Sequence, residues 1–432
     1  MKFIADLHIH SKYSRATSRD MDVENLNKWA KIKGIKVLGT GDFTHALWIK
    51  ELKSKLEPDE PGLFKMKKKS ESSLANNDWL PNNNHHNGGT RFILSSEISC
   101  IYSKNNRTRK IHIVVLAPDF SVVEKINTQL GWIGNLKSDG RPILGLDAKE
   151  LVKIVLNTSQ DCLIIPGHIW TPWFSLFGSM SGFDSIEECF EEYSKYIYAG
   201  ETGLSSDPSM NWRLSMLDKI TLVSNSDAHS PSKLGREANI FETDLSYPAI
   251  IEAIKSKNPQ KFLETIEFFP EEGKYHYDGH RNCQVCLAPQ ESKKLKNICP
   301  KCGRPLTIGV LNRVDVLADR KEGEKPAQVI PFRKTIPLEE IIAEAKGMGS
   351  SSKAVQEEYK NLIKHLGPEL NILLDINPEQ IERVSSPEIA EGVNRVRQGR
   401  VNIEPGHDGE FGRVKIFKDE ERGNFSKQAS LF

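Results

Sequence analysis

With 432 residues, the chain is long enough for two or three domains with substantial hydrophobic cores. Its 59 lysines and arginines balance 58 aspartates and glutamates, so the net charge of +1 excludes a general attraction to nucleic acids or membranes, and any attraction must come from local patches. No apolar run approaches the roughly 20 residues of a membrane span, and the N-terminus does not resemble a signal peptide, which predicts a cytoplasmic protein.

The N-terminal segment 3–10 has the pattern of a short buried strand that carries His8 and His10 at its carboxyl end. Side chains two positions apart on a strand point to the same side, so both imidazoles can bind one ion. Two histidines at this spacing are weak evidence alone, because surface histidines meet it by chance. Further candidate ligands follow later strand-like segments, namely Asp42, Glu97, His112, His168, Asp227 and His229.

Strand-like and helix-like segments alternate through the first 270 residues. The predicted helices cover 22–33 and 147–157, and the predicted strands cover 35–42, 91–95, 111–117, 163–166 and 220–224. This alternation predicts parallel strands with crossover helices, and in α/β barrels the functional groups lie at the carboxyl ends of the strands. Residues 57–90, with an Asn-rich tract and His85-His86, interrupt the alternation and are predicted to be a flexible insertion.

Four cysteines form two Cys-x-x-Cys pairs, namely Cys283, Cys286, Cys299 and Cys302. This spacing is typical of a zinc ribbon, in which four thiolates bind one structural zinc. The surrounding segment 274–304 is rich in lysine and arginine. A solvated face and a phosphate-binding surface explain these charges equally well.

The last third of the chain predicts helices over 338–346, 353–366 and 387–397, followed by a hairpin over 401–417. The final residues, Gln428 to Phe432, end in two apolar side chains after a polar tail. Exposed apolar side chains at a terminus indicate a pocket on a partner protein.

The candidate ligands combine histidines with carboxylates, which favours divalent cations such as zinc, manganese or iron, whereas oxygen ligands alone would favour magnesium or calcium. Glu97 or Asp227 could bridge two ions about 3.5–4 Å apart, an arrangement that promotes phosphoryl transfer to water. The sequence contains no P-loop, dinucleotide-binding glycine motif or Gly-x-Ser-x-Gly turn, which disfavours nucleotide-driven chemistry and a serine nucleophile. Each ligand also has a structural alternative: His112 in the core, His168 in a loop and Asp227 as a cap.

The ligand set as a whole resembles the polymerase-and-histidinol-phosphatase (PHP) family over about residues 1–270. The matching residues are Asp6-Leu7-His8-Ile9-His10, Gly41-Asp42, Glu97, His112, His168 and Asn225-Ser226-Asp227-Ala228-His229. The resemblance implies an α/β fold, a distorted (β/α)7 barrel with a two- or three-metal phosphoesterase site. By the same resemblance, one ion is held by His8, His10, Glu97 and Asp227, a second by Glu97, His112 and His168, and a third lies beside Asp42 and His229. At Asp42-Phe43 the sequence departs from the family, which has Asp-His.

Together with the cysteine pairs and the segment 405–412, the chain resembles the endonuclease Q family over nearly its whole length. This resemblance implies a metal-dependent DNA endonuclease that recognises deaminated bases (uracil, hypoxanthine, xanthine) or abasic sites and cuts on their 5′ side. The segment 428–432 is similar to peptides that bind sliding clamps. The implied organisation is a barrel over 1–272 with the insertion 57–90, a zinc ribbon over 273–335, a helical domain with a hairpin over 336–420 and a tail over 421–432.

For such an activity, the predicted catalytic residues are Asp227, Glu97, His229 and Arg15, with Arg15 contacting the phosphate. An extruded base would stack on Trp170 or Trp173 and be read by Asn225 or Ser205. Two other functions remain open at this point, a small-molecule phosphoesterase of the histidinol-phosphatase type and a non-catalytic DNA-binding adapter.

Overall fold

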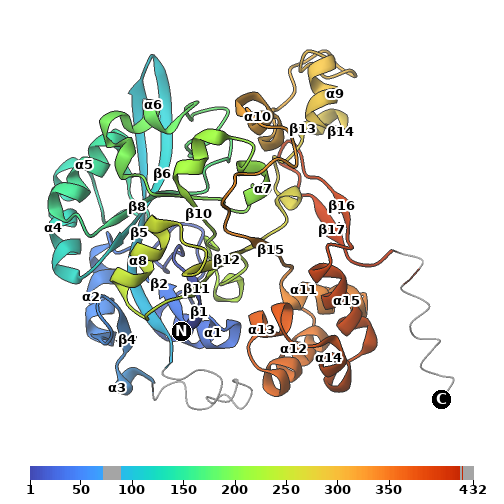
Figure 1. Ribbon diagram of the computed structural model, residues 1–432, viewed down its shortest axis with the longest axis horizontal. Coiled ribbons are helices and arrows are strands. Elements are labelled where there is room, and N and C mark those ends of the chain that lie inside the picture. The colour runs from blue at the N-terminus through green and yellow to red at the C-terminus, as the bar shows by residue number, and fades with distance from the viewer. Residues whose placement is uncertain (72–88, 419–420, 422–432) are drawn as a thin grey trace.

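The computed structural model describes residues 1–71, 89–418 and 421. Its first part is a sheet that curves into a wall with helices on its outer side (Figure 1). Along the sheet the strands are β15 (Phe332–Lys334), β12 (Phe262–Glu267), β11 (Ala238–Glu242), β1 (Lys2–Asp6), β2 (Val37–Gly39) and β5 (Arg91–Lys104). The wall continues through β6 (Arg107–Ala117), β8 (Leu163–Pro166) and the parallel pair β9 (Ala199–Glu201) and β10 (Thr221–Val223). β7 (Ile143–Leu144) pairs with β5.

Alternation along the strands separates the apolar side chains of the two faces of this wall. Phe3 and Ala5 of β1 belong to one buried cluster, and Ile4 between them belongs to another. The first cluster also takes side chains from strands far round the wall, including Val114 and Val223. When strands all round a wall contribute side chains to one apolar cluster, that cluster is the interior of a barrel. The structure thus confirms the predicted fold class.

The helices of this part of the chain begin where the sequence supplies caps. Asp22 accepts a hydrogen bond from the Asn25 N–H at the start of α1 (Val23–Lys33), and Ser246 caps α8 (Tyr247–Ser256) in the same way. The other helices around the barrel are α2 (Ala46–Lys55), α3 (Lys68–Glu71), α4 (Phe120–Ile133), α5 (Ala148–Thr158), α6 (Ile186–Phe190) and α7 (Pro208–Asn211). No helix in the described parts of the chain is both long enough and apolar enough to cross a membrane.

The start of the predicted insertion 57–90 is not flexible but part of the sheet. β3 (Leu56–Pro58) and β4 (Phe64–Met66) form an antiparallel hairpin, and Phe64 of β4 pairs with Phe92 of β5. Its apolar side chains are buried at this edge, which explains why the segment is ordered there. His85 and His86 lie outside the described residues.

The last part of the chain adds two smaller units beside the barrel (Figure 1). The cysteine-containing unit comprises β13 (Asp278–His280), β14 (Val285–Leu287), α9 (Pro289–Lys294) and α10 (Val310–Leu317). The helical unit comprises α11 (Leu338–Lys346), α12 (Lys353–Leu366), α13 (Glu369–Leu374), α14 (Pro378–Val384) and α15 (Pro387–Arg397). Between them the chain returns to the barrel, because β15 pairs with β12, so residues 332–334 do not lie in the ribbon as predicted.

A hairpin of β16 (Asn402–Glu404) and β17 (Arg413–Lys415) follows the helical unit. The loop between its strands returns to the cysteine-containing unit. The Tyr277 N–H donates a hydrogen bond to the carbonyl oxygen of Gly406 (2.9 Å). Segments more than a hundred residues apart therefore meet beside the barrel.

Candidate metal centre

Two loops from opposite ends of the barrel sequence lie side by side at the end of β1. Ile9 forms a β-bridge with Ala228, and the Asp227 N–H donates to the carbonyl oxygen of His8 (2.9 Å). This backbone pairing brings the side chain of Asp227 next to His8 and His10. The predicted convergence of distant ligands therefore follows from strand pairing.

The first ligand group consists of His8, His10, Glu97 and Asp227, whose donor atoms all lie within 4.8 Å of one another. His10 Nε2 lies 3.2 Å from Glu97 Oε2 and 3.0 Å from Asp227 Oδ1. His8 Nε2 lies 3.7 Å and 3.8 Å from the same two atoms. These separations suit ligands that each lie about 2.1 Å from one shared ion.

The buried donors of this group support metal binding because they lack other partners. His8 Nε2, His10 Nε2 and Asp227 Oδ1 are buried and make no hydrogen bond. An unsatisfied buried polar atom costs roughly 1–3 kcal/mol, and a divalent cation would satisfy all three at once. The residues therefore fit a metal site.

A second ligand group shares Glu97 with the first. His112 Nδ1 lies 2.6 Å and His168 Nε2 lies 3.0 Å from Glu97 Oε1, while Oε2 of the same carboxylate faces the first group. Donor atoms of Glu97, His112 and His168 again fall within 4.8 Å of one another. One carboxylate with an oxygen on each group is the arrangement expected of a bridge between two ions.

Two buried carboxylates behind the first group orient its imidazoles. His8 Nδ1 donates to Glu201 Oε1 (2.9 Å), and His10 Nδ1 donates to Asp42 Oδ1 (3.0 Å). Each bond fixes the tautomer whose Nε2 lone pair faces the ion site. Burial opposes protonation of His8, but the charges of Glu201 and Glu97 outweigh it and hold the pKa of His8 well above its ordinary value. The sequence reasoning missed Glu201, although it ends a strand as the other ligands do.

The structure does not place Asp42 among the ligands, contrary to the prediction. Its second oxygen accepts hydrogen bonds from the Ser11 N–H (2.7 Å) and the Ser14 hydroxyl (2.9 Å). The carboxylate therefore faces away from the space that the two ligand groups enclose, which we call the cup. His229 lies beside the first group, with its ring centroid 4.5 Å from that of His10 and its Nδ1 donating to the Asp227 carbonyl (2.8 Å). Within the described residues, the barrel contains no third group of three ligands.

Two of the predicted base-binding residues are structural instead. Asn225 is buried behind His8, where it donates to Glu201 Oε1 (2.9 Å) and accepts from the Leu7 N–H (2.9 Å). Trp170 is only 1% exposed, and its indole N–H donates to Asn211 Oδ1 (2.7 Å). Both predictions are wrong because long-range packing, which local sequence does not show, turns these side chains inward.

The other two predicted base-binding residues stay accessible. Trp173 is 37% exposed and packs edge-on against Tyr275, with ring centroids 5.6 Å apart. Ser205 is half-buried in the loop that follows Gly203, whose Cα approaches the side chain of His168. These residues therefore stand near the second ligand group with surface left for a substrate.

Arg141, which the sequence reasoning missed, takes the place predicted for Arg15. Arg141 Nη1 lies 3.1 Å from Glu97 Oε2, inside the cup. Arg15 is 72% exposed along its side chain and pairs with Asp139 (3.3 Å). Nothing in the sequence around Arg141 distinguishes it from the other loop arginines.

The cysteine-containing unit brings together three of the four predicted zinc ligands. Cys283, Cys299 and Cys302 converge, and the fourth member of their group is His280 rather than Cys286. Cys286 Sγ instead lies 3.9 Å from the carbonyl oxygen of Pro405. The prediction of four cysteine ligands is therefore wrong for Cys286.

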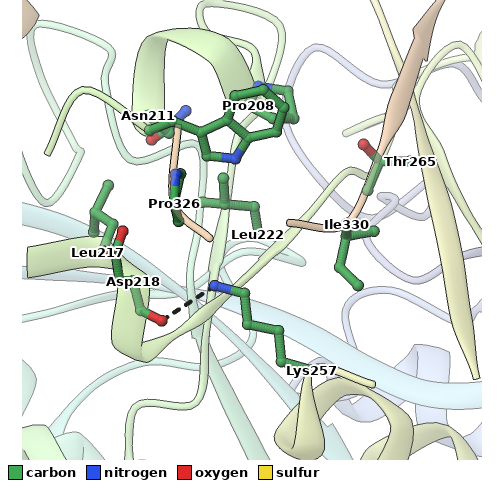
Figure 2. Close-up of a pocket in the computed structure, with 10 residues that line it drawn as sticks. Pro208, Asn211, Leu217, Asp218, Leu222, Lys257, Thr265, Pro326 and Ile330 are labelled. Carbon is green, nitrogen blue, oxygen red and sulfur yellow. Dashed lines mark hydrogen bonds between the residues drawn. The ribbon is translucent and has the colours of Figure 1, made fainter. Parts of the chain in front are cut away.

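A narrow pocket elsewhere in the barrel part contains no residue of the two barrel ligand groups or of the cysteine group (Figure 2). It lies between Pro208, Leu222 and Ile330, and its main polar contact is a hydrogen bond from Lys257 Nζ to the backbone oxygen of Asp218 (3.1 Å). Among the described residues, its lining contains no group of metal ligands, so we assign the metal chemistry to the cup.

A comparison with solved structures decides the family. The crystal structure of the lesion-specific endonuclease PfuEndoQ from Pyrococcus furiosus aligns with 100% of this chain and 100% of its own, at 32% identity and a TM-score of 0.83. The chain belongs to the endonuclease Q family. An endonuclease Q complex with a 27-mer duplex carrying an abasic lesion at the active site aligns over 97% of this chain and 98% of its own, at 32% identity and a TM-score of 0.81.

Two comparisons of sequence find further similarity to one archaeal protein. The uncharacterized protein MJ0043 of Methanocaldococcus jannaschii is 35% identical over 270 residues, which are 61% of this chain and 33% of that protein. This chain thus spans about a third of that relative. The model of the MJ0043 C-terminal domain matches residues 337–400, which contain α11 to α15.

Proposed function

We propose that this chain is a metal-dependent DNA endonuclease that acts at damaged bases. The observation that carries the proposal is the pair of ligand groups joined by Glu97 in one buried cup. Support comes from the end-to-end likeness to a lesion-specific endonuclease, and from a relative whose abasic duplex lies at the active site. Divalent cations held by these groups would supply an activated water and stabilise charge on the phosphate.

The protein groups around the cup have separate tasks in this proposal. Glu201 and Asp42 hold the imidazoles of the first group in place. Arg141, which pairs with Glu97, would contact a non-bridging phosphate oxygen of a bound substrate. Such fixed charges act strongly because the cup is largely shielded from water.

His229 is the proposed proton carrier at the mouth of the cup. Its Nδ1–H is bound to the Asp227 carbonyl, so Nε2 is the acceptor. Burial lowers the pKa of His229, with partial compensation by the charge of Asp227. The imidazole is therefore neutral at neutral pH and can accept a proton from the attacking water or give one to the leaving 3′ oxygen.

We further propose that the substrates are deaminated bases and abasic sites, and that cleavage falls on the 5′ side of the lesion. A flipped-out base needs an aromatic platform and a hydrogen-bond donor. The exposed Trp173 and the half-buried Ser205 hydroxyl are our candidates for these two contacts.

Nicking assays test the proposal. Labelled duplexes with a single uracil, hypoxanthine or abasic site, or with no lesion, are incubated with the protein and Mg²⁺, Mn²⁺ or Zn²⁺. We expect a nick 5′ to the lesion that Asp227→Asn abolishes and that Asp20→Asn, the same change at an exposed position, leaves intact. Binding without cleavage would indicate an adapter, and release of phosphate from histidinol phosphate alone would indicate a small-molecule phosphoesterase.

We also propose that Gln428 to Phe432 bind a sliding clamp. The segment lies outside the described residues, and the proposal is based on its sequence alone. Deleting 428–432 should abolish clamp pull-down and leave nicking of a short uracil duplex unchanged. Pull-down that survives the deletion would refute the assignment.

A further inference from the structure

The hairpin of β13 and β14 turns Cys286 away from the other cysteines. Val285 and Leu287 pack in one cluster with Cys299 and Leu306. Successive side chains of a strand point to opposite faces, so Cys286, between Val285 and Leu287, faces the other way. In agreement with this geometry, Cys286 is not part of the group of donor atoms that lie within 4.8 Å of one another.

His280 occupies the position that Cys286 leaves open. His280 Nδ1 lies 3.3 Å from Cys302 Sγ, and the four donor atoms of His280, Cys283, Cys299 and Cys302 lie within 4.8 Å of one another. A tetrahedral zinc with bonds of about 2.3 Å to sulfur and 2.0 Å to nitrogen places its ligands roughly 3.5–3.8 Å apart. The group has the size of such a site.

The two halves of the group have the same ligand spacing and a left-handed residue in the same place. His280 and Cys283 are separated by two residues, as are Cys299 and Cys302. The residue after each second ligand is left-handed, Gln284 with φ of 49° and Gly303 with φ of 71°. Each turn is closed by a backbone hydrogen bond of 2.9 Å, from the Gln284 N–H to the Arg281 carbonyl and from the Gly303 N–H to the Cys299 carbonyl.

From these three observations we propose that this unit binds one zinc ion through His280, Cys283, Cys299 and Cys302, and that Cys286 is a free thiol. With four protein ligands and no open position, the site is structural. It carries one negative charge fewer than a four-cysteine site, because the imidazole is neutral. The assignment does not depend on the proposed nuclease activity.

The zinc site would stabilise the contact between the cysteine-containing unit and the loop 405–412. Directly after His280, the Arg281 N–H donates to Asp408 Oδ2 (2.6 Å), and the Thr307 hydroxyl donates to Asp408 Oδ1 (2.6 Å). The same loop presents Phe411, which is 71% exposed and has Lys274 Nζ 4.4 Å from its ring centroid. Loss of the ion would therefore loosen this loop as well as the hairpin.

Cobalt substitution of the full-length protein tests the ligand set. Co²⁺ bound to thiolates absorbs strongly in the near ultraviolet, and the barrel groups contain no cysteine, so this band reports the cysteine site alone. We expect Cys286→Ser to keep the band and Cys283→Ser to lose much of it. His280→Cys should raise its intensity by about a third, since four thiolates replace three.

Zinc retention against a chelator gives a second readout for the same variants. We expect Cys286→Ser to retain zinc like the unmodified protein, and His280→Ala to release it roughly tenfold faster or more. His280→Cys should retain zinc, which shows that a variant at this position folds. A weakened band or faster zinc loss in Cys286→Ser, or an unchanged band in His280→Cys, would overturn the proposal.

Discussion

Arg141 is the only arginine that the structure, within its described residues, pairs with a carboxylate of the ligand groups. Its guanidinium has a planar array of donors that suits phosphate oxygens, and it is held close to the atoms that react. Arg15, by contrast, extends into solvent beside Asp139. Arg141 is therefore the residue that we propose for contact with the substrate phosphate, and Arg15 is not.

We predict that Arg141→Ala lowers the single-turnover nicking rate by about 10²–10³-fold, the usual effect of removing one donor to a developing charge. The measurement uses a labelled uracil duplex at saturating Mn²⁺. Arg15→Ala is the matched control and should stay within a few-fold of the unmodified protein. A larger loss in Arg15→Ala than in Arg141→Ala would reverse the assignment.

The two strand histidines also predict a pH dependence of metal uptake. Burial disfavours the charged imidazoles, but Glu201 and Asp42 more than offset it, so the pKa values of His8 and His10 in the metal-free protein lie well above 6.5. Protons therefore compete with cations even near neutral pH.

We expect the number of Mn²⁺ ions bound per chain, at a fixed limiting concentration, to rise between about pH 6 and pH 8. Mn²⁺ is suitable because thiolates bind it poorly, so the cysteine site contributes little. His365→Ala, which removes an exposed histidine, should give the same profile. Occupancy that is equal or higher at the acidic end would contradict the prediction.

At the scale of the secondary-structure elements, two buried carboxyl groups lie on neighbouring strands. Glu237 directly precedes β11, and Glu267 is the last residue of β12. Burial, reinforced by the nearby Glu267, raises the pKa of Glu237 well above its ordinary value. Burial likewise raises the pKa of Glu267 to about 8, although the hydroxyls of Thr265 and Thr202 donate to it (2.5 and 3.0 Å). Both groups are therefore protonated in the folded protein at neutral pH.

A carboxyl group with a raised pKa in the folded state stabilises the fold at low pH and loses this contribution as pH rises from 4.5 toward 8. In the unmodified protein, Glu267 should lower the free energy of unfolding by up to about 1.4 kcal/mol for each pH unit in this range. We predict that the Glu267→Gln variant lacks this contribution, so that its free energy of unfolding depends less on pH. Urea unfolding at several pH values measures the effect.

Glu322→Gln, an exposed change of the same kind, is the control and should follow the pH profile of the unmodified protein. Parallel profiles for Glu267→Gln and the unmodified protein would show that Glu267 does not titrate in this window.

At the scale of the whole molecule, one buried ion pair joins the barrel to the helical unit. Lys33 Nζ, at the end of α1, lies 2.6 Å from Glu369 Oε2 at the start of α13, and both side chains are almost fully buried. Glu369 also accepts hydrogen bonds from the Tyr359 hydroxyl (2.5 Å) and the Leu338 N–H (3.2 Å). The pair is thus part of a polar network within an apolar contact.

Removing one partner leaves a buried charge without its counter-ion, which costs about 3–5 kcal/mol. We therefore predict that Lys33→Met destabilises the contact by about 3 kcal/mol and speeds hydrogen exchange in α11 to α15. The double variant Lys33→Met/Glu369→Gln should recover part of the loss, because neither charge remains.

Lys353→Met provides the control for this pair. Lys353 also pairs with a glutamate on a helix, but its side chain is 90% exposed, and exposed pairs contribute at most about 1 kcal/mol. Equal hydrogen exchange in Lys33→Met and Lys353→Met would show that the buried pair does not hold the two parts together.

The sequence by itself determined the parts of this protein that depend on residue type and local pattern. Histidines and carboxylates after strand-like segments predicted a shared metal site, because residues at the carboxyl ends of neighbouring strands meet at one mouth, and the family resemblance divided them into the two ligand groups. The alternation of strand-like and helix-like segments predicted parallel strands with crossover helices, and the resemblance to the PHP family added the barrel. Capping residues such as Asp22 marked helix starts within a residue or so.

Only the tertiary structure decided which way individual side chains face. Asp42 and Asn225 resemble ligands or substrate contacts in the sequence, yet they support the imidazoles from behind. His280 faces the three converging cysteines and Cys286 does not, although the cysteine spacing favours the opposite choice. The physical reason is that burial and hydrogen-bond partners come from segments tens to hundreds of residues away, so the orientation of a side chain is set by packing that no local pattern contains.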